Sequence, residues 1–270
     1  MPRSYAFIDG AAFEFGVLPI FKDLDTELED INWAALTRSA DRIFYFDALP
    51  VKKKETDSDS DFEKKIEQKK RTFGLLKRVP NMHVREGFTR VKSNSNRPQL
   101  TQKGVDIALA CEVLLHSHLE NIEIARLFLN DLDFCPLLES LTSTRVRTEL
   151  FYIAGKTADE LLEVADISEE VTHYSVFDSL PQKNKRTFAL ESCSVTEYPD
   201  SILKQSGIGQ YGPIQLWHSV SSDIYILDGL MESETYCCKC RSAELLIAHF
   251  NKVGVGPIIW IPGLPTKLRR

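Results

Sequence analysis

Four aspartates in the first half of the chain are placed where a metal-dependent reaction could be assembled. Asp9 ends the apolar run YAFID, Asp106 lies in KGVDIALACEVL, and Asp131 and Asp133 follow the apolar run IARLFLN. Carboxylates that lie close together repel one another unless a cation lies between them. Mg²⁺ is the hard divalent cation that prefers such oxygen ligands. The four residues therefore predict a divalent metal site and phosphodiester chemistry.

The segments around these aspartates have the pattern of alternating strands and helices. Strands are expected over 5–9, 42–47, 83–86, 123–130 and 148–152, and helices over 33–39, 61–79, 105–116, from about 136, and 158–164. This alternation predicts a parallel, doubly wound α/β sheet. Functional residues of such sheets lie beyond the carboxyl ends of the strands, where Asp9, Asp47, Asp131 and Asp133 fall. Asp106 lies in the first turn of its helix, where the helix dipole favours a carboxylate.

The pattern becomes less regular after about residue 177. The polar segment 181–186 is typical of a connector, 207–213 of a glycine-rich loop, 224–227 and 257–261 of strands, and 243–251 of a helix. We therefore expect two domains. Residues 1–177 carry the acidic site, and residues 178–270 form a smaller α/β accessory domain.

Composition restricts the class of protein. A hydrophobic fraction of 43% is that of a packed globular chain, and the net charge of −6 argues against a uniformly basic surface for nucleic acid. The sequence shows neither an export leader nor an apolar run long enough to span a bilayer. We therefore expect a cytoplasmic protein without a membrane partner, whose six cysteines stay reduced.

Four motifs occur in the order and spacing of a known family. They are IDG at 8–10, FYFDALP at 44–50, QKGVDIALACEVL at 102–114 and NDLDFCPLLESL at 130–141. On these motifs, residues 1–175 or so resemble an NYN domain of the LabA-like branch of the PIN-like ribonuclease superfamily. The combination of KGVD with a following D-x-D-F-x-P-L element is specific.

The resemblance implies a function for each aspartate. Relatives place the corresponding acids around one or two Mg²⁺ or Mn²⁺ ions, which implies that Asp9, Asp106, Asp131 and Asp133 are both the metal ligands and the catalytic residues. Cleavage of RNA would then leave a 5′-phosphate and a 3′-hydroxyl. Glu112 takes the place of a further family acid. Because a helix turns by about 240° over six residues, Glu112 does not share the face of Asp106 and is a secondary metal candidate.

Two features depart from the family pattern. Relatives carry Asn three residues after the first aspartate, where this chain has Ala12, and Gly and Ser beside the first aspartate of the turn, where it has Asn130 and Leu132. All the carboxylates are present, but one polar contact near the ion is lost. These departures bear on the rate of reaction and the substrate geometry more than on metal binding.

The basic segment 87–103 is the candidate contact for the RNA backbone. It is a polar loop in our interpretation and contains Arg90, Lys92, Arg97 and Lys103 but no acid. Cations of this kind supply much of the sequence-independent affinity for nucleic acid. An ordinary solvated loop is the alternative. Phe88 and Phe13 could stack on bases, although isolated aromatic residues are more often part of the core.

The cysteines offer a weaker metal hypothesis. Cys237 and Cys240 form one C-x-x-C pair, and Cys193, His218 and His249 could be distant ligands for zinc. A structural zinc site usually needs a second closely spaced pair, which the sequence lacks. Free or buried thiols are therefore the favoured interpretation.

Together these observations predict a ribonuclease dependent on Mg²⁺ or Mn²⁺, with a C-terminal domain that selects RNA or binds a second copy or a protein partner. The main alternative is a catalytically inactive RNA- or protein-binding module on the same scaffold, which Ala12 and Leu132 favour. A phosphatase-like or DNA-directed hydrolase with the same acidic site is a third hypothesis.

Overall fold

The computed structural model describes residues 2–50, 58–94, 97–231 and 234–262; within them, only the backbone of 88–94, 97–103, 231 and 254–255 is described. The chain divides into two compact units. The first comprises Met1–Pro19 and Glu27–Val171, and the second comprises Ile20–Thr26 and Thr172–Arg270. In the described parts of the chain, no helix is long and apolar enough to cross a membrane.

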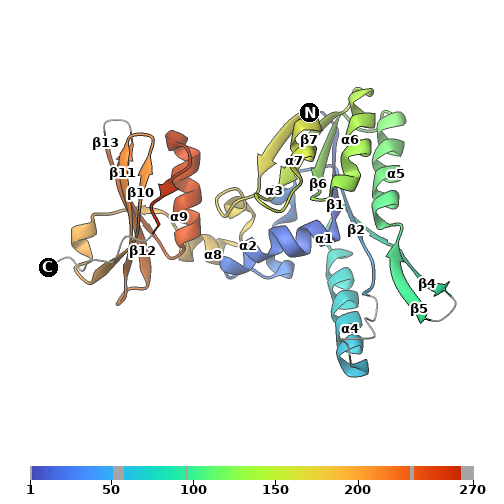
Figure 1. The fold of residues 1–270 in the computed structure, drawn as a ribbon, viewed down its shortest axis with the longest axis horizontal. Helices are drawn as coiled ribbons and strands as arrows, with labels where there is room; N and C mark the ends of the chain where they lie inside the picture. The colour runs from blue at the N-terminus through green and yellow to red at the C-terminus, as the bar shows by residue number, and fades with distance from the viewer. Residues whose placement is uncertain (1, 51–57, 95–96, 232–233, 263–270) are drawn as a thin grey trace. The chain divides into compact units, whose positions relative to one another are not determined.

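A six-stranded parallel sheet forms the centre of the first unit (Figure 1). Its strands, in spatial order, are β3 (Met82–Glu86), β2 (Arg42–Asp47), β1 (Ser4–Asp9), β6 (Ile124–Phe128), β7 (Arg147–Tyr152) and β8 (Ile167–Glu170). Every neighbouring pair is parallel. The predicted α/β class and doubly wound sheet are confirmed, and β8 is an additional strand.

Helices cover both faces of this sheet, which is why its central strands are almost continuously apolar. On one face, Tyr5 and Phe7 join a core with residues of α5 (Val105–His118), α6 (Cys135–Thr142) and α7 (Asp159–Val164). On the other face, Phe13 contacts Trp33 and Tyr45. These residues come from the segment after β1, from α3 (Trp33–Leu36) and from β2.

The segment after β1 is helical, which the sequence analysis did not predict. It consists of α1 (Gly10–Ala12), a π-helical turn η1 (Phe13–Val17) and α2 (Leu18–Asp23), followed by the short helix η2 (Leu28–Asp30). The remaining helix, α4 (Asp59–Leu76), was expected over 61–79. Its end before Val79 reflects the sharp turn into β3.

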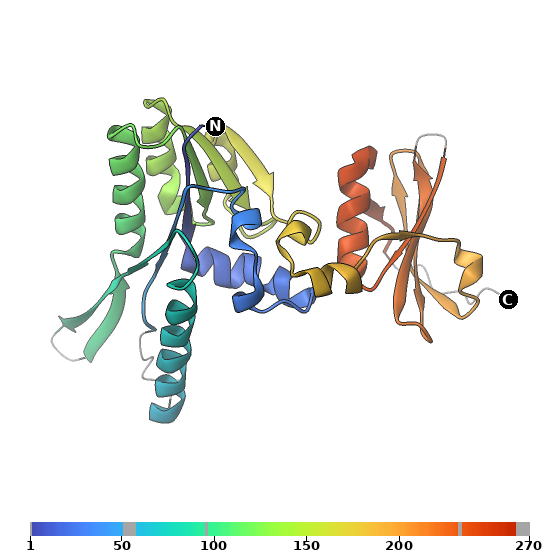
Figure 2. The same ribbon diagram turned by 180° about the vertical axis from the view of Figure 1, so that it is seen from behind.

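The basic segment 87–103 is a hairpin and not the expected loop. Strands β4 (Phe88–Asn94) and β5 (Arg97–Lys103) pair in antiparallel fashion, with Val91 opposite Leu100. Strand-forming residues such as these two are interspersed with charges, which concealed the pattern. The hairpin leads directly into α5, as both views show (Figure 2).

The second unit contains a six-stranded sheet that is antiparallel throughout. Its order is β14 (Ile259–Trp260), β10 (Ser201–Gly209), β11 (Gly212–Ser219), β12 (Ile224–Met231), β13 (Glu234–Cys240) and β9 (Glu191–Ser192). Helix α9 (Ala243–Phe250) packs on β12 and β13. The short helices are η4 (Phe177–Ser179), α8 (Gln182–Thr187), η5 (Val195–Glu197) and η6 (Asn251–Val255).

The glycines at 207–212 belong to a hairpin and not to the predicted loop. Gly209 pairs with Gly212 at the tight turn between β10 and β11. Gly207 belongs to β10 itself, where a Cβ would lie 2.7 Å from Ile258 and 2.9 Å from the Ile259 carbonyl. The glycines therefore serve close strand contacts in addition to the turn.

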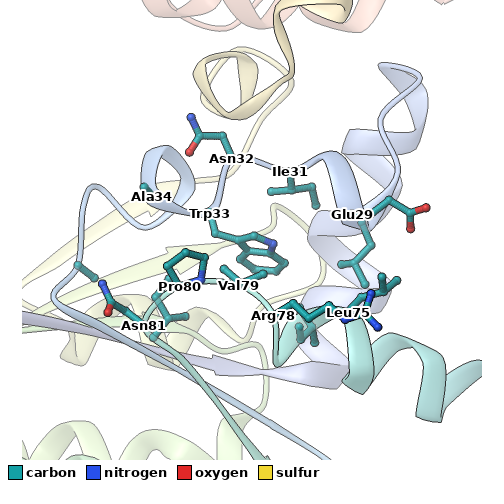
Figure 3. A pocket seen from close by; sticks show the side chains of 14 residues that line it. Glu29, Ile31, Asn32, Trp33, Ala34, Leu75, Arg78, Val79, Pro80 and Asn81 are labelled. Carbon is teal, nitrogen blue, oxygen red and sulfur yellow. The ribbon is translucent and has the colours of Figure 1, made fainter.

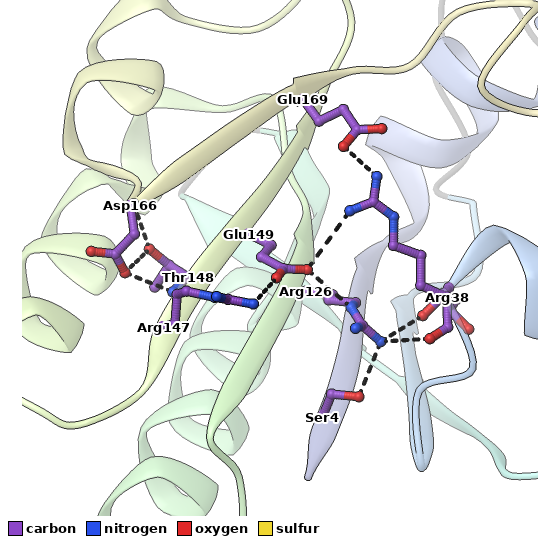
Figure 4. Close-up of polar contacts among 9 residues, drawn as sticks. Ser4, Arg38, Arg126, Arg147, Thr148, Glu149, Asp166 and Glu169 are labelled. Atoms are coloured by element: carbon purple, nitrogen blue, oxygen red, sulfur yellow. Dashed lines mark hydrogen bonds and ion pairs between the residues drawn. The ribbon is translucent and has the colours of Figure 1, made fainter. Parts of the chain in front are cut away.

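A buried arginine fixes one face of the parallel sheet (Figure 4). Arg126 Nε donates to Glu149 Oε2 at 3.1 Å, and Arg126 Nη1 donates to Ser4 Oγ and to the carbonyls of Thr37 and Arg38 at 2.9–3.0 Å. The side chains of Arg126 and Glu149 are only 12% and 7% exposed. This one guanidinium therefore ties three strands to the turn that follows α3.

Replacing Arg126 with Met should remove the buried donor to the Glu149 carboxylate and one donor to each of two carbonyls. We expect Arg126→Met to lower the free energy of unfolding by about 3 kcal/mol, the usual cost of breaking a buried ion pair. Arg147→Met is the matched control, because Arg147 also bonds Glu149, at 2.7 Å, but is 52% exposed; it should cost below about 1 kcal/mol. Urea denaturation measures both, and equal losses would contradict the buried role.

Candidate functional site

Three chain segments carry the predicted aspartates at the carboxyl edge of the parallel sheet. Asp9 is the last residue of β1, and Asp131 and Asp133 lie in the turn after β6, where Asp131 precedes the short helix η3 (Leu132–Phe134). Strands β1 and β6 are adjacent, with Ile8 opposite Phe128, so both segments leave the sheet at the same edge. Asp106 enters from the first turn of α5.

The pKa values of these acids show that their charges interact. The pKa of Asp9 is raised to about 6, mainly by burial and in smaller part by the charges of Asp106 and Asp47, against a hydrogen bond from the Ala12 N–H that lowers it. Burial also raises the pKa of Asp106, with Asp131 and Asp133 adding to the effect. Asp106 thus links Asp9 to the acidic turn after β6. The structure brings the four predicted aspartates into one negatively charged region.

Two of these aspartates also cap local backbone. Asp9 Oδ2 accepts from Ala12 N at 2.9 Å, and Asp131 Oδ1 accepts from Asp133 N at 3.2 Å. Each of these caps uses one carboxylate oxygen. Within the described residues, Asp106 makes neither a hydrogen bond nor an ion pair. The capping role that Asp commonly has after a strand therefore coexists with the charge cluster.

A buried lysine next to this region was not predicted from the sequence. Lys69 Nζ lies 2.6 Å from Asp47 Oδ2 and 2.6 Å from Glu14 Oε1, and its side chain is only 15% exposed. Burial alone would lower the pKa of Lys69, but the hydrogen bonds to the two carboxylates outweigh it and raise the pKa. Lys69 therefore stays charged and offsets part of the negative charge of Asp47 and Glu14. Its position in an amphipathic helix with many lysines gave no signal of this role.

Two glycines are needed where the acidic segments begin. A Cβ on Gly10, the residue after Asp9, would lie 2.5 Å from the Asp47 carboxyl carbon, so a side chain there would displace the Asp47–Lys69 pair. Gly104 has φ +89°, a left-handed conformation that favours glycine, and it precedes α5 and Asp106. The G in IDG and in KGVD thus has a steric cause.

Glu112 does not face the aspartates. Its carboxylate accepts from Arg85 Nη2 at 2.8 Å and from Arg85 Nε at 3.3 Å, and it lies 3.5 Å from His116 Nε2. These partners lower the pKa of Glu112 although burial raises it. The carboxylate is already neutralised by Arg85, so we leave Glu112 out of the proposed ion site.

Ala12 and Asn130, two of the residues that depart from the family motif, each make a defined contact. Ala12 contributes its N–H to the Asp9 cap, a contact that needs no particular side chain. Asn130 Oδ1 accepts from Thr157 Oγ1 at 2.7 Å, which ties the end of β6 to the start of α7. Leu132 stands 48% exposed between Asp131 and Asp133.

The carboxylates suit a hard cation, although they do not form a closed cage. Among the described residues, no three His, Cys, Asp or Glu side chains converge closely enough to hold a metal ion together. Mg²⁺ commonly binds through one or two carboxylates and keeps several of its waters. Oxygen donors with raised pKa values and no paired cation fit an ion held in this way.

The other residues that the sequence suggested for RNA contacts or zinc binding do not belong to the acidic region as the structure describes it. The side chains of Arg90, Lys92, Arg97 and Lys103 lie outside the described residues, as does the side chain of Phe88. Phe13 is fully buried, so it belongs to the core and does not stack on bases. Cys240 donates to the Phe188 carbonyl and His218 lies 3.1 Å from Asp223, so neither side chain is placed as a zinc ligand in the described part of the second unit.

A pocket of about 540 Å³ in the first unit is separate from the acidic region (Figure 3). Trp33, Ile43 and Val79 give it apolar walls, and Asn32, Arg78 and Asn81 are among its polar lining residues. Ile43 and Asn81 lie near the amino ends of β2 and β3, at the edge of the sheet opposite to the aspartates. None of the predicted site residues is among its described lining residues.

Comparison with known proteins identifies the class. The sequence model of the NYN domain matches residues 21–171, more than half of the chain, and the chain therefore belongs to the NYN domain family, whose fold is that of PIN-like nucleases. No curated protein sequence matches the chain. A crystal structure of a protein of unknown function from Vibrio parahaemolyticus is similar at 12% identity, over 63% of this chain and 93% of that one, with a TM-score of 0.42. A TM-score this low does not establish a shared fold.

The raised pKa of Asp9 predicts how stability depends on pH. Because the folded state holds this proton up to about pH 6 and an unfolded Asp loses it near pH 3.8, the folded state binds more protons between these values. The free energy of unfolding should therefore fall by up to about 3 kcal/mol as pH rises through this window in the absence of divalent ions. Asp9→Asn should remove this decrease. Urea denaturation at pH 4, 5, 6 and 7 measures it; equal slopes for both proteins would contradict the prediction.

Removing the Lys69 charge should leave two partly buried carboxylates without a cation. We expect Lys69→Met to lower the free energy of unfolding by about 3 kcal/mol. Lys64→Met is the matched control on the same helix, because Lys64 is 78% exposed and lies 3.9 Å from Asp61; its loss should be below about 1 kcal/mol. Thermal unfolding without divalent ions compares the two, and similar losses would refute the role of Lys69.

Proposed function

We propose that the protein is a ribonuclease that uses Mg²⁺ or Mn²⁺, with Asp9, Asp106, Asp131 and Asp133 as the metal-binding and catalytic residues. Residues 1–177 form the catalytic domain in this proposal, and the substrate is cytoplasmic RNA. The membership of the NYN family supports nuclease chemistry. The metal and the substrate are inferred from the site.

The observation that carries the proposal is a contrast in charge neutralisation. Asp47 and Glu14 are paired with Lys69, and Glu112 is paired with Arg85. Within the described residues, none of the four proposed ligands has a salt bridge, although burial, and in smaller part the charges of neighbouring acids, raises the pKa of Asp9 and Asp106. Repulsion between unpaired carboxylates is costly unless a cation is bound. In this proposal the scaffold pairs the surrounding acids with Lys69 and Arg85, and an ion pairs with the four aspartates.

Each carboxylate has a defined part in the proposed reaction. A bound Mg²⁺ or Mn²⁺ would lower the pKa of water and stabilise charge on the phosphate. Asp106 and Asp131 would hold the ion through oxygens that no described cation occupies. Asp9, whose pKa is about 6, is largely ionised at neutral pH and would orient water or accept its proton. Asp133 adds negative charge at the exposed side of the turn.

The hairpin β4–β5 is the proposed contact for the RNA backbone. Its backbone leads through Gly104 into the helix that carries Asp106. Arg90, Lys92, Arg97 and Lys103 make this hairpin rich in cations, which bind phosphates without regard to sequence. The end of β5 is only a few residues from Asp106 along the chain, so a phosphate bound at this end of β5 would lie close to the acidic region.

Cleavage of a labelled single-stranded RNA tests the proposal directly. We expect the wild type to cut the RNA with Mn²⁺ or Mg²⁺ and to stop when EDTA is added. Asp106→Asn and Asp131→Asn should each lower the rate by about 100-fold or more, since even outer-shell changes at metal sites cost 10- to 100-fold. Mn²⁺ should raise the melting temperature of the wild type and not that of these variants.

Glu123→Gln is the matched control, because it removes one exposed carboxylate next to the amino end of β6, at the opposite edge of the same sheet. It should retain full activity. Activity in Asp131→Asn equal to that of this control would sink the assignment. A labelled DNA of the same sequence distinguishes the DNA-directed hydrolase.

A non-catalytic RNA-binding module is the second candidate, and one observation favours it. The described acidic side chains do not converge on a single point as ligands of a tightly held ion do. In that case RNA would bind without cleavage, independently of EDTA. Neutralising Asp106 would then tighten RNA binding by removing repulsion from the phosphates.

A further inference from the structure

Two cysteines face each other at the edge of the antiparallel sheet in the second unit. Cys193 directly follows the edge strand β9, and Cys237 lies in β13, where Ser192 pairs with Cys238. The Cys193 N–H donates to the Cys237 carbonyl at 3.1 Å, so the ladder continues by one residue and places the two cysteines opposite each other. Their sulfurs lie 3.6 Å apart.

This geometry allows a covalent bond with little movement. A disulfide needs sulfurs about 2.05 Å apart and Cα atoms about 4.4–6.8 Å apart. Directly opposed residues of antiparallel strands have Cα atoms about 4.5–5.5 Å apart. The backbone therefore already meets the requirement, and side-chain rotation alone closes the remaining gap between the sulfurs.

The pair is distinct from the other cysteines of the chain. Cys240 is buried and donates to the Phe188 carbonyl, and Cys238 is buried with its sulfur near the Lys239 carbonyl. Cys111 and Cys135 belong to α5 and α6 of the first unit. No second pair of sulfurs is in hydrogen-bond contact among the cysteines, all of which the structure describes as free thiols.

A pocket gives small molecules access to the pair. Its volume is about 640 Å³, and Cys193 and Cys237 line it together with Ser194, Tyr236 and His249. Both cysteines are partly exposed. A molecule of the size of a hydroperoxide can therefore reach the sulfurs without unfolding the sheet.

We propose that Cys193 and Cys237 are a redox modification site, at which a hydroperoxide oxidises the two thiols to a disulfide that ties β9 to β13. The site belongs to the accessory unit and does not depend on the proposed nuclease activity. The disulfide would be a covalent crosslink at the edge of the antiparallel sheet.

The two sulfurs have different parts in the reaction. Burial raises the pKa of Cys237 overall, but a hydrogen bond from the backbone N–H of Val195, and one from Cys193 when Cys193 is the donor, favour the Cys237 thiolate. The Cys237 thiolate attacks one peroxide oxygen, so that an S–O bond forms, the O–O bond breaks, and the other oxygen leaves as water or alcohol. Cys193 then attacks the Cys237 sulfenic acid, the S–S bond forms, and water leaves with the thiol proton. The thiols lose two electrons and the peroxide gains them.

The disulfide would act on a short edge strand of the sheet. Strand β9 has two residues, lies at the edge and pairs only with β13. The two cysteines are 44 positions apart in the sequence, so the bond would close a long loop of the unfolded chain. Closing such a loop stabilises the folded state. Oxidation should therefore raise the thermal stability of the second unit.

Peptide mapping of the full chain after peroxide treatment tests the proposal. The protein carries Cys111→Ser, which removes the exposed thiol of α5 as a source of crosslinks between molecules. After incubation with hydrogen peroxide and blocking of free thiols with N-ethylmaleimide, we expect one linked peptide that contains Cys193 and Cys237 and has lost two hydrogen atoms. The melting temperature should rise by about 5 °C or more, and a thiol reductant should reverse both changes.

Single variants separate the roles of the two sulfurs. Cys193→Ser should accumulate the sulfenic acid at Cys237, which dimedone traps, whereas Cys237→Ser should leave Cys193 as a thiol. Cys135→Ser is the control and should form the same disulfide as the parent protein. Peroxide treatment that leaves both cysteines open to N-ethylmaleimide, or that links Cys237 to a different cysteine, would overturn the proposal. Both of these outcomes are measured on the Cys111→Ser parent protein, so they test the proposal even if one of the single variants does not fold.

Discussion

Unequal neutralisation of carboxylates at one edge of the parallel sheet is the constraint on which the first unit depends. The edge gathers acids from β1, β2, α5 and the turn after β6, and such a gathering destabilises the fold unless its charge is compensated. Lys69 compensates Asp47 and Glu14 with two contacts of 2.6 Å. Burial, together with the charges of neighbouring acids, raises the pKa of Asp9 and Asp106, so these two carboxyl groups bind protons more tightly. A cation would remove the same repulsion, and this links the stability of the fold to the proposed ion.

Elsewhere on the same sheet, a buried carboxylate is fully paired with cations. Glu149 is as buried as Asp47, but Arg126 and Arg147 both donate to it and Arg126 also satisfies two carbonyls. That network holds strands and a turn in place and leaves no unpaired charge. The contrast separates carboxylates that build the fold from carboxylates that are left for a ligand.

The sequence predicted the sheet well because parallel strands buried on both faces have continuous apolar runs that end at polar residues. It also predicted that Asp9, Asp131 and Asp133 lie at the carboxyl ends of their strands, because the apolar runs end at these residues. It did not predict Lys69, because a partner that is distant in sequence leaves no local pattern. The helical segment after β1 was missed for a related reason: its π-helical turn FEFGV lacks the regular spacing of an amphipathic helix. The antiparallel hairpins were obscured by charges in β4–β5 and by glycines in β10–β11.

A single glycine separates the hairpin β4–β5 from the helix that presents Asp106. Gly104 ends one element and begins the next, its φ of +89° sets the angle between them, and a Cβ there would meet no atom within 4 Å. A residue with a side chain would be opposed by backbone conformation and not by crowding. Changes in the length or charge of the hairpin can therefore accumulate without disturbing the packing of α5 on the sheet. This junction would let the hairpin evolve a different binding surface while the position of Asp106 in the first turn of α5 stays the same.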